Sequence, residues 1–172
     1  MAKNIILVGL MGAGKTTIGR HLAKRRNLQF IDLDHEIEAR TGVKIPLIFE
    51  IEGETGFRER ESKVLDEISR QTGLVIATGG GVVERPENRE VLKRTGTVVY
   101  LHVLPQLLYE RTRHDTNRPL LQVADPLHRL KELFARRYPL YREVADVVVN
   151  GRGGSVSHLV NQVEKELARC TA

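Results

Sequence analysis

The chain has 172 residues, of which 41% are hydrophobic, 28% charged and 5% aromatic, values typical of a soluble globular protein and unlike those of disordered, collagen-like or membrane-embedded chains. Lysine and arginine outnumber aspartate and glutamate by 27 to 22, and the formal net charge of +5 favours an anionic partner. Because acidic residues are interspersed among the basic ones and tryptophan is absent, we expect no nucleic-acid partner.

The N-terminal region and the cysteine content predict a cytoplasmic protein that does not contact a membrane. The apolar run from Ile5 to Met11 is shorter than the roughly 20 residues that cross a bilayer, and no small-residue cleavage site follows it. Cys170 is the only cysteine, which excludes an intrachain disulfide and fits a reducing compartment. The six histidines form no pair of the His-Glu-x-x-His kind, so we expect no protein-caged zinc.

Short apolar runs alternate with segments of helical periodicity along the chain. Such runs are typical of strands buried on both faces of a parallel sheet. The predicted strands are Ile5–Gly9, Leu28–Leu33, Leu74–Thr78, Thr97–Leu101 and Val147–Val149. The predicted helices are roughly 15–26, 34–41, 57–72, 86–95, 105–113, 126–142 and 156–169. This alternation predicts one α/β domain over residues 1–172, with helices on both faces of its sheet.

One segment, about 113–126, interrupts this alternation. From His114 to Pro126 it is polar, contains two prolines and joins two predicted helices. A loop of about a dozen residues is uncommon in a compact domain and is often functional. We expect this segment to be a mobile lid.

The strongest motif follows the first predicted strand. Residues 9–16, Gly-Leu-Met-Gly-Ala-Gly-Lys-Thr, match G-x-x-x-x-G-K-[ST] without a mismatch, between an apolar strand and an amphipathic helix. Glycines let successive backbone N–H groups turn toward a phosphate, and the helix N-terminus adds its positive dipole end. Lys15 is then placed to reach the β- and γ-phosphates, and the Thr16 hydroxyl to ligate Mg²⁺. The motif predicts ATP or GTP binding.

Two aspartates follow the second predicted strand. Asp32 and Asp34 lie two residues apart, so both can face the edge of the sheet where α/β proteins bind ligands. Asp32 suits the Mg²⁺ shell, and Asp34 suits a substrate hydroxyl that it would orient or deprotonate. An alternative role for Asp34 is to cap the helix that follows.

A glycine-rich turn follows the third predicted strand at the same edge. Thr78-Gly-Gly-Gly-Val (78–82) allows a ligand or another backbone to approach closely, although an ordinary flexible turn would look the same.

Three arginines are candidates for anion binding. Arg58 begins a charged helix, where it could instead be a surface residue paired with Glu61 or Glu54. Arg118 lies in the predicted lid, from which it could close over a phosphate or remain a solvated charge. Arg137 lies near a helix end, where a cation also stabilises the helix dipole.

Together these motifs resemble those of shikimate kinases, in order and over nearly the whole chain. The matching segments are G-x-x-G-x-G-K-T at 9–16, D-x-D at 32–34, G-F-R at 56–58, G-G-G at 79–81, R-P-L-L at 118–121 and R-x-P-L-Y at 137–141. The resemblance implies a nucleoside-monophosphate-kinase-like P-loop fold with a five-stranded parallel sheet. It also implies a monomer that transfers the ATP γ-phosphate to the 3-hydroxyl of shikimate.

The resemblance also implies roles for individual residues at the ATP end. Lys15 would neutralise charge, Thr16 would ligate Mg²⁺ with Asp32 in its outer shell, and Arg118 would close onto the phosphates with the lid. Arg111 would stack on the adenine, and Arg152 would contact the adenine or ribose in a segment where the match is weakest. The residues that would hold the ATP phosphates are Gly12, Ala13, Gly14, Lys15, Thr16 and Thr17.

At the acceptor end, the resemblance implies that Asp34 binds the shikimate hydroxyls and positions the attacking oxygen. Arg58 and Arg137 would bind the carboxylate with the backbone of Gly80, and Arg136 is a less favoured substitute for Arg137. A carboxylate needs cations and hydroxyls need an acceptor, so this set suits a polyhydroxy acid. The alternatives are another small-molecule P-loop kinase, such as a gluconate or nucleoside monophosphate kinase, and a regulatory module that binds ATP without turnover.

Overall fold

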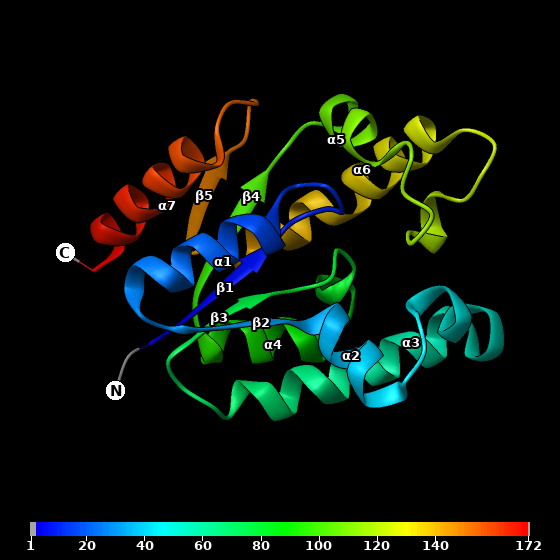
Figure 1. Cartoon of the computed structure of the whole chain (residues 1–172), viewed down its shortest axis with the longest axis horizontal. Helices are drawn as coiled ribbons and strands as arrows, with labels where there is room; N and C mark the ends of the chain where they lie inside the picture. Colours follow the sequence, from blue (N-terminus) through cyan, green and yellow to red (C-terminus); the bar gives the residue numbers. More distant parts are fainter. Residues whose placement is uncertain (1–2, 172) are drawn as a thin grey trace.

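The computed structural model describes residues 3–171, and within them five strands form one parallel sheet in the order β2-β3-β1-β4-β5 (Figure 1). The strands are β1 (Asn4–Val8), β2 (Gln29–Asp32), β3 (Leu74–Ala77), β4 (Gly96–His102) and β5 (Val147–Asn150). Every residue of β1 and β3 is buried, as expected for strands that are apolar on both faces. The predicted strands are confirmed to within a residue or two.

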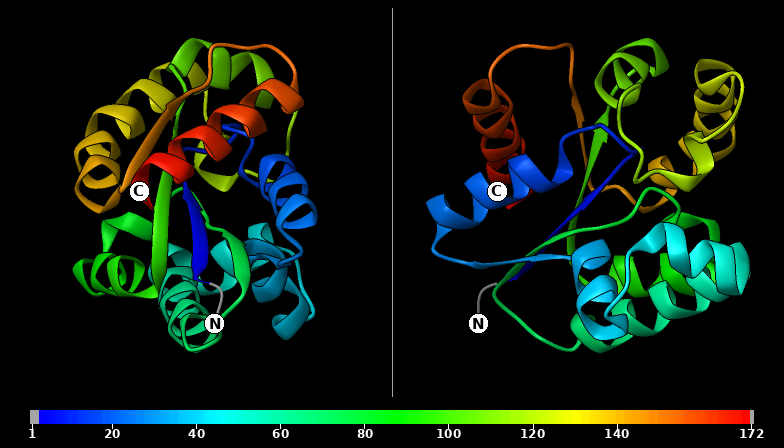
Figure 2. Two further views of the ribbon diagram at one scale, coloured as in Figure 1. Left: turned by 90° about the vertical axis from the view of Figure 1, so that its left-hand side faces the viewer. Right: turned by 45° about the vertical axis from the view of Figure 1, so that its right-hand side comes forward.

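Seven α-helices and two short 3₁₀ turns complete the described chain. They are α1 (Lys15–Arg26), α2 (Leu33–Thr41), α3 (Ile45–Ser69), η1 (Val82–Glu84), α4 (Pro86–Thr95), α5 (Pro105–Thr112), η2 (Pro119–Leu121), α6 (Pro126–Val144) and α7 (Val156–Cys170). Helices α1 and α7 pack on one face of the sheet, and α4 and α6 pack on the other (Figure 2). The sheet is therefore the middle of three layers, as the sequence pattern predicts.

The register of the sheet brings three motifs to one edge. Asp32, the last residue of β2, pairs with Ala77 at the end of β3, and Ala77 pairs with Leu7 near the end of β1. The phosphate-loop motif, the two aspartates and the glycine turn thus all begin at the carboxyl ends of neighbouring strands. Ligands bind at this edge in open α/β sheets because the loops there diverge.

Helix α3 is longer than predicted. It begins at Ile45 instead of 57, and Gly53, at φ 70° and ψ −179°, breaks it into two parts. Glycines at 53 and 56 indicate a break in the helical pattern, so the sequence predicts a helix only after them. The first part of α3, residues 45–52, was therefore not predicted. This part carries Phe49 to within 4.9 Å of Phe57, measured between ring centroids. The helix start thus provides an apolar wall beside Arg58.

The segment between α5 and α6 forms a loop beyond the carboxyl ends of the strands (Figure 1). It is ordered by its own polar contacts: the Asp115 carboxylate accepts hydrogen bonds from the backbone N–H of Asn117 and from Nε of Arg118. Its movement as a lid stays a prediction. Among the helices of residues 3–171, none has the length and apolar character needed to cross a membrane.

Candidate active site

The phosphate-loop motif connects β1 to α1 and lines a cavity of about 430 Å³. Gly12 and Gly14 have φ values of 82° and 99°, which L-residues rarely adopt, so the motif needs glycine at both positions. The remaining lining comes from β2, α2, the glycine turn, α5, the predicted lid and α7. The lining residues are Met11, Gly12, Ala13, Gly14, Lys15, Thr16, Thr17, Ile18, Asp32, Asp34, Thr78, Gly79, Gly80, Arg111, Arg118, Gly154, Val156 and Leu159.

Lys15 is the buried cation of this cavity, and its side chain bends back onto the loop. Its Nζ donates to the backbone oxygens of Gly9 and Leu10, at 2.6 and 2.9 Å. Burial, and secondarily the neighbouring Arg118, lowers the pKa of Lys15 from 10.5 to about 7. A buried ammonium of this kind is stabilised by an anion, and a phosphate placed in the cavity would provide one.

Thr16 and Asp32 lie side by side at the floor of the cavity. The Thr16 hydroxyl donates to Asp32 Oδ2 at 2.5 Å, while Asp32 Oδ1 accepts from the backbone N–H of His35 at 3.2 Å. Asp32, not Asp34, therefore caps α2, and the capping alternative for Asp34 is wrong. Hydroxyl and carboxylate oxygens at a phosphate site are the donors that Mg²⁺ uses, so these residues fit the ion.

Asp34 lies in the first turn of α2 and points toward the glycine turn. Its Oδ1 is buried and accepts no hydrogen bond from any residue in 3–171. Burial, and then the nearby Asp32, raises the pKa of this carboxyl above its usual range. A Cβ at Gly79 would lie only 3.0 Å from Asp34 Oδ1. Asp34 Oδ1 is thus a buried oxygen that can accept a hydrogen bond from a ligand.

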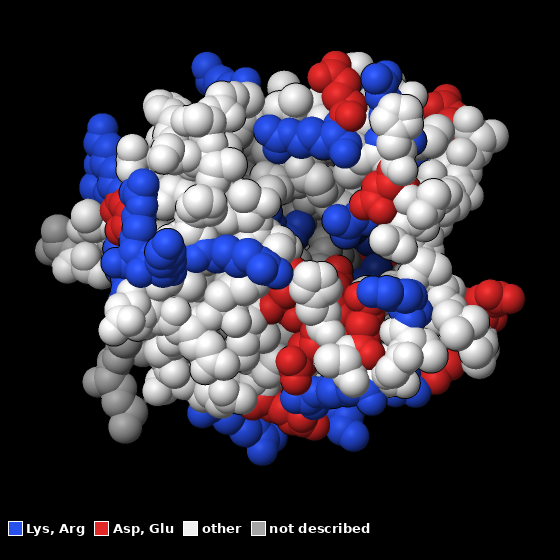
Figure 3. Space-filling view, in the orientation of Figure 1, with Lys and Arg blue, Asp and Glu red and all other residues white. Residues whose placement is uncertain are grey.

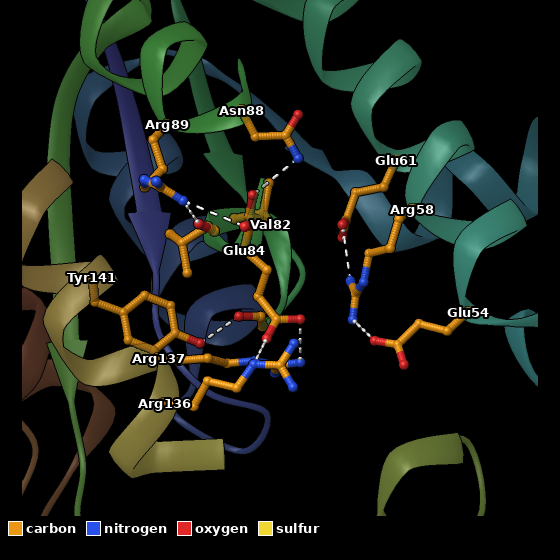
Figure 4. A network of polar contacts seen from close by, with 12 residues as sticks. Glu54, Arg58, Glu61, Val82, Glu84, Asn88, Arg89, Arg136, Arg137 and Tyr141 are labelled. Atoms are coloured by element: carbon orange, nitrogen blue, oxygen red, sulfur yellow. Dashed lines mark hydrogen bonds and ion pairs between the residues drawn. The ribbon is translucent and has the colours of Figure 1, made fainter. Parts of the chain in front are cut away.

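Arg58 is buried, with 8% of the residue exposed. Its Nη1 donates to Glu61 Oε1 at 2.9 Å and its Nη2 to Glu54 Oε1 at 3.3 Å (Figure 4). The alternative of a surface ion pair was therefore right about the partners and wrong about the exposure. Arg58 Nε is buried and has no acceptor within the described chain.

Arg137 is even more buried, at 1% exposure, and comes from α6 on the opposite side. Its Nε and Nη1 are buried and have no hydrogen-bond acceptor in residues 3–171. Its neighbour Arg136 has 62% of its side chain exposed, so the structure favours Arg137 as the buried cation. Unpaired buried donors are rare, and these point to an anionic ligand.

A second cavity, of about 60 Å³, lies between these arginines and adjoins the first. Both cavities are lined by Met11, Asp34, Gly79, Gly80 and Arg118. The second is closed further by Ile45, Phe49, Phe57, Arg58, Glu61, Gly81, Asn117, Pro119, Leu120 and Arg137. The space-filling view of Figure 3 shows a hollow in this face of the molecule, with side chains of both signs around it. A small acid bound there would lie next to phosphates bound in the first cavity.

The glycine turn makes room for charged side chains. A Cβ at Gly80 would lie 3.2 Å from Arg137 Nη1, and a Cβ at Gly81 would overlap the Arg58 guanidinium. Neither residue has a positive φ, so the glycines serve here to leave space, and a side chain would displace the arginines. The sequence predicted that a ligand or another backbone segment approaches the glycine turn closely. In the structure, the guanidinium groups of Arg58 and Arg137 also approach it closely.

The remaining predicted arginines differ in position. Arg118 lines both cavities, and its Nε lies 3.1 Å from Asp115 Oδ2. Arg111 Nη1 donates to the backbone oxygen of Gly12 at 3.0 Å and lines the first cavity. Arg152 is exposed and lines a separate cavity between β5 and α7, so the structure does not bring it to the phosphate loop.

Two acidic residues beside the arginines were not predicted to belong to the site: Glu61 was considered only as a surface partner of Arg58, and Glu84 was not singled out. Glu61 is fully buried between Arg58 and Gly79, and burial raises its pKa. Its spacing of three residues from Arg58 was visible in the sequence, but its burial was not. Glu84, in η1, lies beside Arg137, and no motif marked it.

The chain is similar to members of one known protein family. The shikimate kinase family profile matches residues 11–168. A shikimate kinase from Aromatoleum aromaticum is 62% identical over 163 residues, covering 95% of this chain and 93% of that protein. The structure of shikimate kinase from Acinetobacter baumannii in complex with shikimate aligns with a TM-score of 0.96 at 49% identity, covering 98% of this chain and 94% of that one. A gluconokinase from Sinorhizobium meliloti, at 16% identity and a TM-score of 0.58, shares the fold alone.

Proposed function

The chain belongs to the shikimate kinase family, and we propose that its two adjoining cavities bind ATP and shikimate for transfer of the γ-phosphate to the shikimate 3-hydroxyl. It is an ATP-dependent small-molecule kinase, and its products are shikimate 3-phosphate and ADP.

One observation carries the assignment of the cavities. Asp34 lines both, and the unpaired buried donors of Arg58 and Arg137 lie at the smaller one. A ligand there must offer a carboxylate to the arginines and a hydroxyl to Asp34. Shikimate has both, on a ring small enough to leave the reacting hydroxyl beside the phosphates.

The phosphate end of the site neutralises charge. Lys15 leaves the carbonyl oxygens of Gly9 and Leu10 to pair with the β- and γ-phosphates, and Arg118 contacts them from the predicted lid. Thr16 and Asp32 would hold Mg²⁺, which, when bound, offsets negative charge on the phosphates. Closure of the lid over this cavity would exclude water and so suppress ATP hydrolysis.

The acceptor end positions the nucleophile. Arg58 and Arg137 fix the carboxylate, which aims the 3-hydroxyl at the γ-phosphorus. Its oxygen attacks phosphorus, the bond to the leaving ADP oxygen breaks, and the hydroxyl proton moves to Asp34. The raised pKa of Asp34 makes it a stronger base than an exposed aspartate.

ADP release with different acceptors tests the function. With ATP and Mg²⁺, we expect turnover on shikimate and only background release with gluconate, AMP or no acceptor. Gluconate tests the specificity of the site, because it is also a polyhydroxy acid but lacks the ring. Turnover with gluconate or AMP in place of shikimate would contradict the acceptor assignment, and ATP binding without turnover on any acceptor would indicate a regulatory module.

Arg58→Ala tests the carboxylate site. We expect shikimate affinity to fall by more than about 100-fold, because a buried cationic partner of the carboxylate is lost, while ATP affinity stays close to wild type. Titration calorimetry measures both. Arg60→Ala is the matched control, since Arg60 lies two residues further along α3 and forms an exposed pair with Glu52. Unchanged shikimate affinity in Arg58→Ala would remove Arg58 from the site.

A further inference from the structure

Glu84 is a half-buried acid two residues after the glycine turn, with 11% of its side chain exposed. Its Oε2 accepts a hydrogen bond from Arg137 Nη2 at 3.4 Å, and its Oε1 lies 2.7 Å from Arg136 Nε. The contact with Arg136 lacks hydrogen-bond alignment, so within the described chain Arg137 is the hydrogen-bond partner of this carboxylate. Figure 4 shows both guanidinium groups converging on it.

The backbone that carries Glu84 is held in place by α4. Asn88 Nδ2 donates to the Val82 oxygen at 3.0 Å, and Arg89 Nη1 donates to the Val83 oxygen at 2.8 Å. Arg89 also pairs with Glu143 of α6 at 2.6 Å. Glu84 thus lies on a turn that contacts both neighbouring helices. These contacts fix the position of its carboxylate relative to Arg137 of α6.

Glu84 does not line either cavity of the site. It binds one end of the Arg137 guanidinium, while Nη1 lies on the side of Gly80, which lines both cavities. Tyr141 supports the same arrangement from the next turn of α6, since its hydroxyl donates to the Gly80 oxygen. Arg58, on the other side of the second cavity, also has a carboxylate partner, since its Nη1 donates to Glu61.

We propose that Glu84 is a positioning residue that holds the Arg137 guanidinium toward the acceptor carboxylate, and that it thereby selects Arg137 over the adjacent Arg136 for this role. The proposal rests on the proposed function, because it assigns the carboxylate of shikimate as the group that Arg137 meets.

A negative charge near a site for an anion has two opposite effects. It fixes the direction of Arg137, which strengthens binding, and it repels the substrate carboxylate, which weakens binding. The repulsion is small because Glu84 lines neither cavity and the charge of Arg137 offsets its own. The directional effect is large because Arg137 is fully buried and has no water to replace a lost acceptor. Removal of Glu84 is therefore expected to weaken binding.

The test compares shikimate with its methyl ester, which has the same ring and hydroxyls but no negative charge. For Glu84→Ala we expect roughly 10- to 100-fold weaker binding of shikimate, the loss typical of a charge-assisted hydrogen bond. Binding of the ester and of ATP should change by less than about twofold. Glu84→Gln keeps an acceptor oxygen, so its loss for shikimate should be smaller and equally selective for the acid.

Arg136→Gln is the matched control, since it removes the other cation on Glu84 and leaves the hydrogen bond to Arg137. We expect shikimate affinity to stay within about twofold of wild type. Thermal unfolding by circular dichroism checks the fold of each variant, and Glu84→Gln carries the test if Glu84→Ala does not fold.

Three results would overturn the proposal: tighter shikimate binding in the Glu84 variants, an equal loss for acid and ester, or a loss in Arg136→Gln as large as in Glu84→Ala. Failure of the proposed function is distinguishable, because the wild-type protein would then not bind shikimate at all.

Discussion

Replacement of Asp34 by asparagine is expected to lower kcat by roughly 10²- to 10⁴-fold, the range over which a positioned general base contributes. The amide keeps the size and one oxygen of the carboxylate but takes up no proton. Shikimate KM should change much less, because the arginines at the other end of the acceptor still bind the carboxylate. Steady-state ADP release at saturating ATP measures both parameters.

The pH profile gives a second readout for Asp34. Its raised pKa means that the carboxyl stays protonated to a higher pH than an ordinary aspartate, so wild-type activity should rise with pH through that pKa. This rise should be absent in Asp34→Asn.

Glu36→Gln is the control for Asp34→Asn, since Glu36 lies in the same turn and pairs with Arg40 at 3.0 Å. We expect wild-type kinetics for it. A kcat of Asp34→Asn within about threefold of wild type would show that proton acceptance at this position is dispensable.

Replacement of Lys15 by methionine is expected to reduce kcat by roughly 10²- to 10³-fold or more, because a preorganised cation at the transferring phosphate is lost. The fold should survive, since methionine fits the buried path of the lysine stem. ADP release measures the loss, and circular dichroism checks the fold. Retained turnover in a folded variant would refute the assignment of the phosphate loop.

Proton uptake checks the state of Lys15 in the wild-type protein. With a pKa of about 7, the free enzyme holds the lysine only partly protonated at neutral pH, whereas an ATP-bound ammonium stays protonated. ATP binding should therefore take up protons at pH 7 to 8, and ATP affinity should fall as pH rises. Calorimetry in buffers of different ionisation enthalpy measures the uptake. In the same ATP titration, Lys15→Met should take up fewer protons than the wild-type protein, because the contribution of Lys15 is absent.

The chain order of elements followed from local patterns. The five strands were visible as continuous apolar runs, and six of the seven helices had bounds close to those observed. The exception is α3, in which Gly53 has a non-helical conformation. The glycine therefore does interrupt the helix, as its sequence pattern indicates, but the helix resumes after it. Tertiary packing of Phe49 on Phe57 decides that outcome, and it is invisible to periodicity.

Site residues within a contiguous motif were also predictable, because their spacing alone fixes their geometry. Residues 12–17 all line the first cavity, and Asp32 and Asp34 join them at the edge that the strand order dictates. Arg58 was ambiguous, since a spacing of three or four residues from an acid is the same for an exposed and a buried pair. Arg152 lies in a loop whose path the sequence does not constrain, and it lies outside the first cavity.

The fold class and the phosphate loop could be predicted from the amino-acid sequence, because both depend on residues that are neighbours along the chain. Which charged side chains are buried at the site depends on the packing of distant elements. Arg137 lines the acceptor cavity while Arg136 is largely exposed, and the carboxylates of Glu84 and Glu61 contact Arg137 and Arg58. These choices depend on contacts between η1, α3 and α6, whose residues are far apart in the sequence, and such contacts leave no local signal.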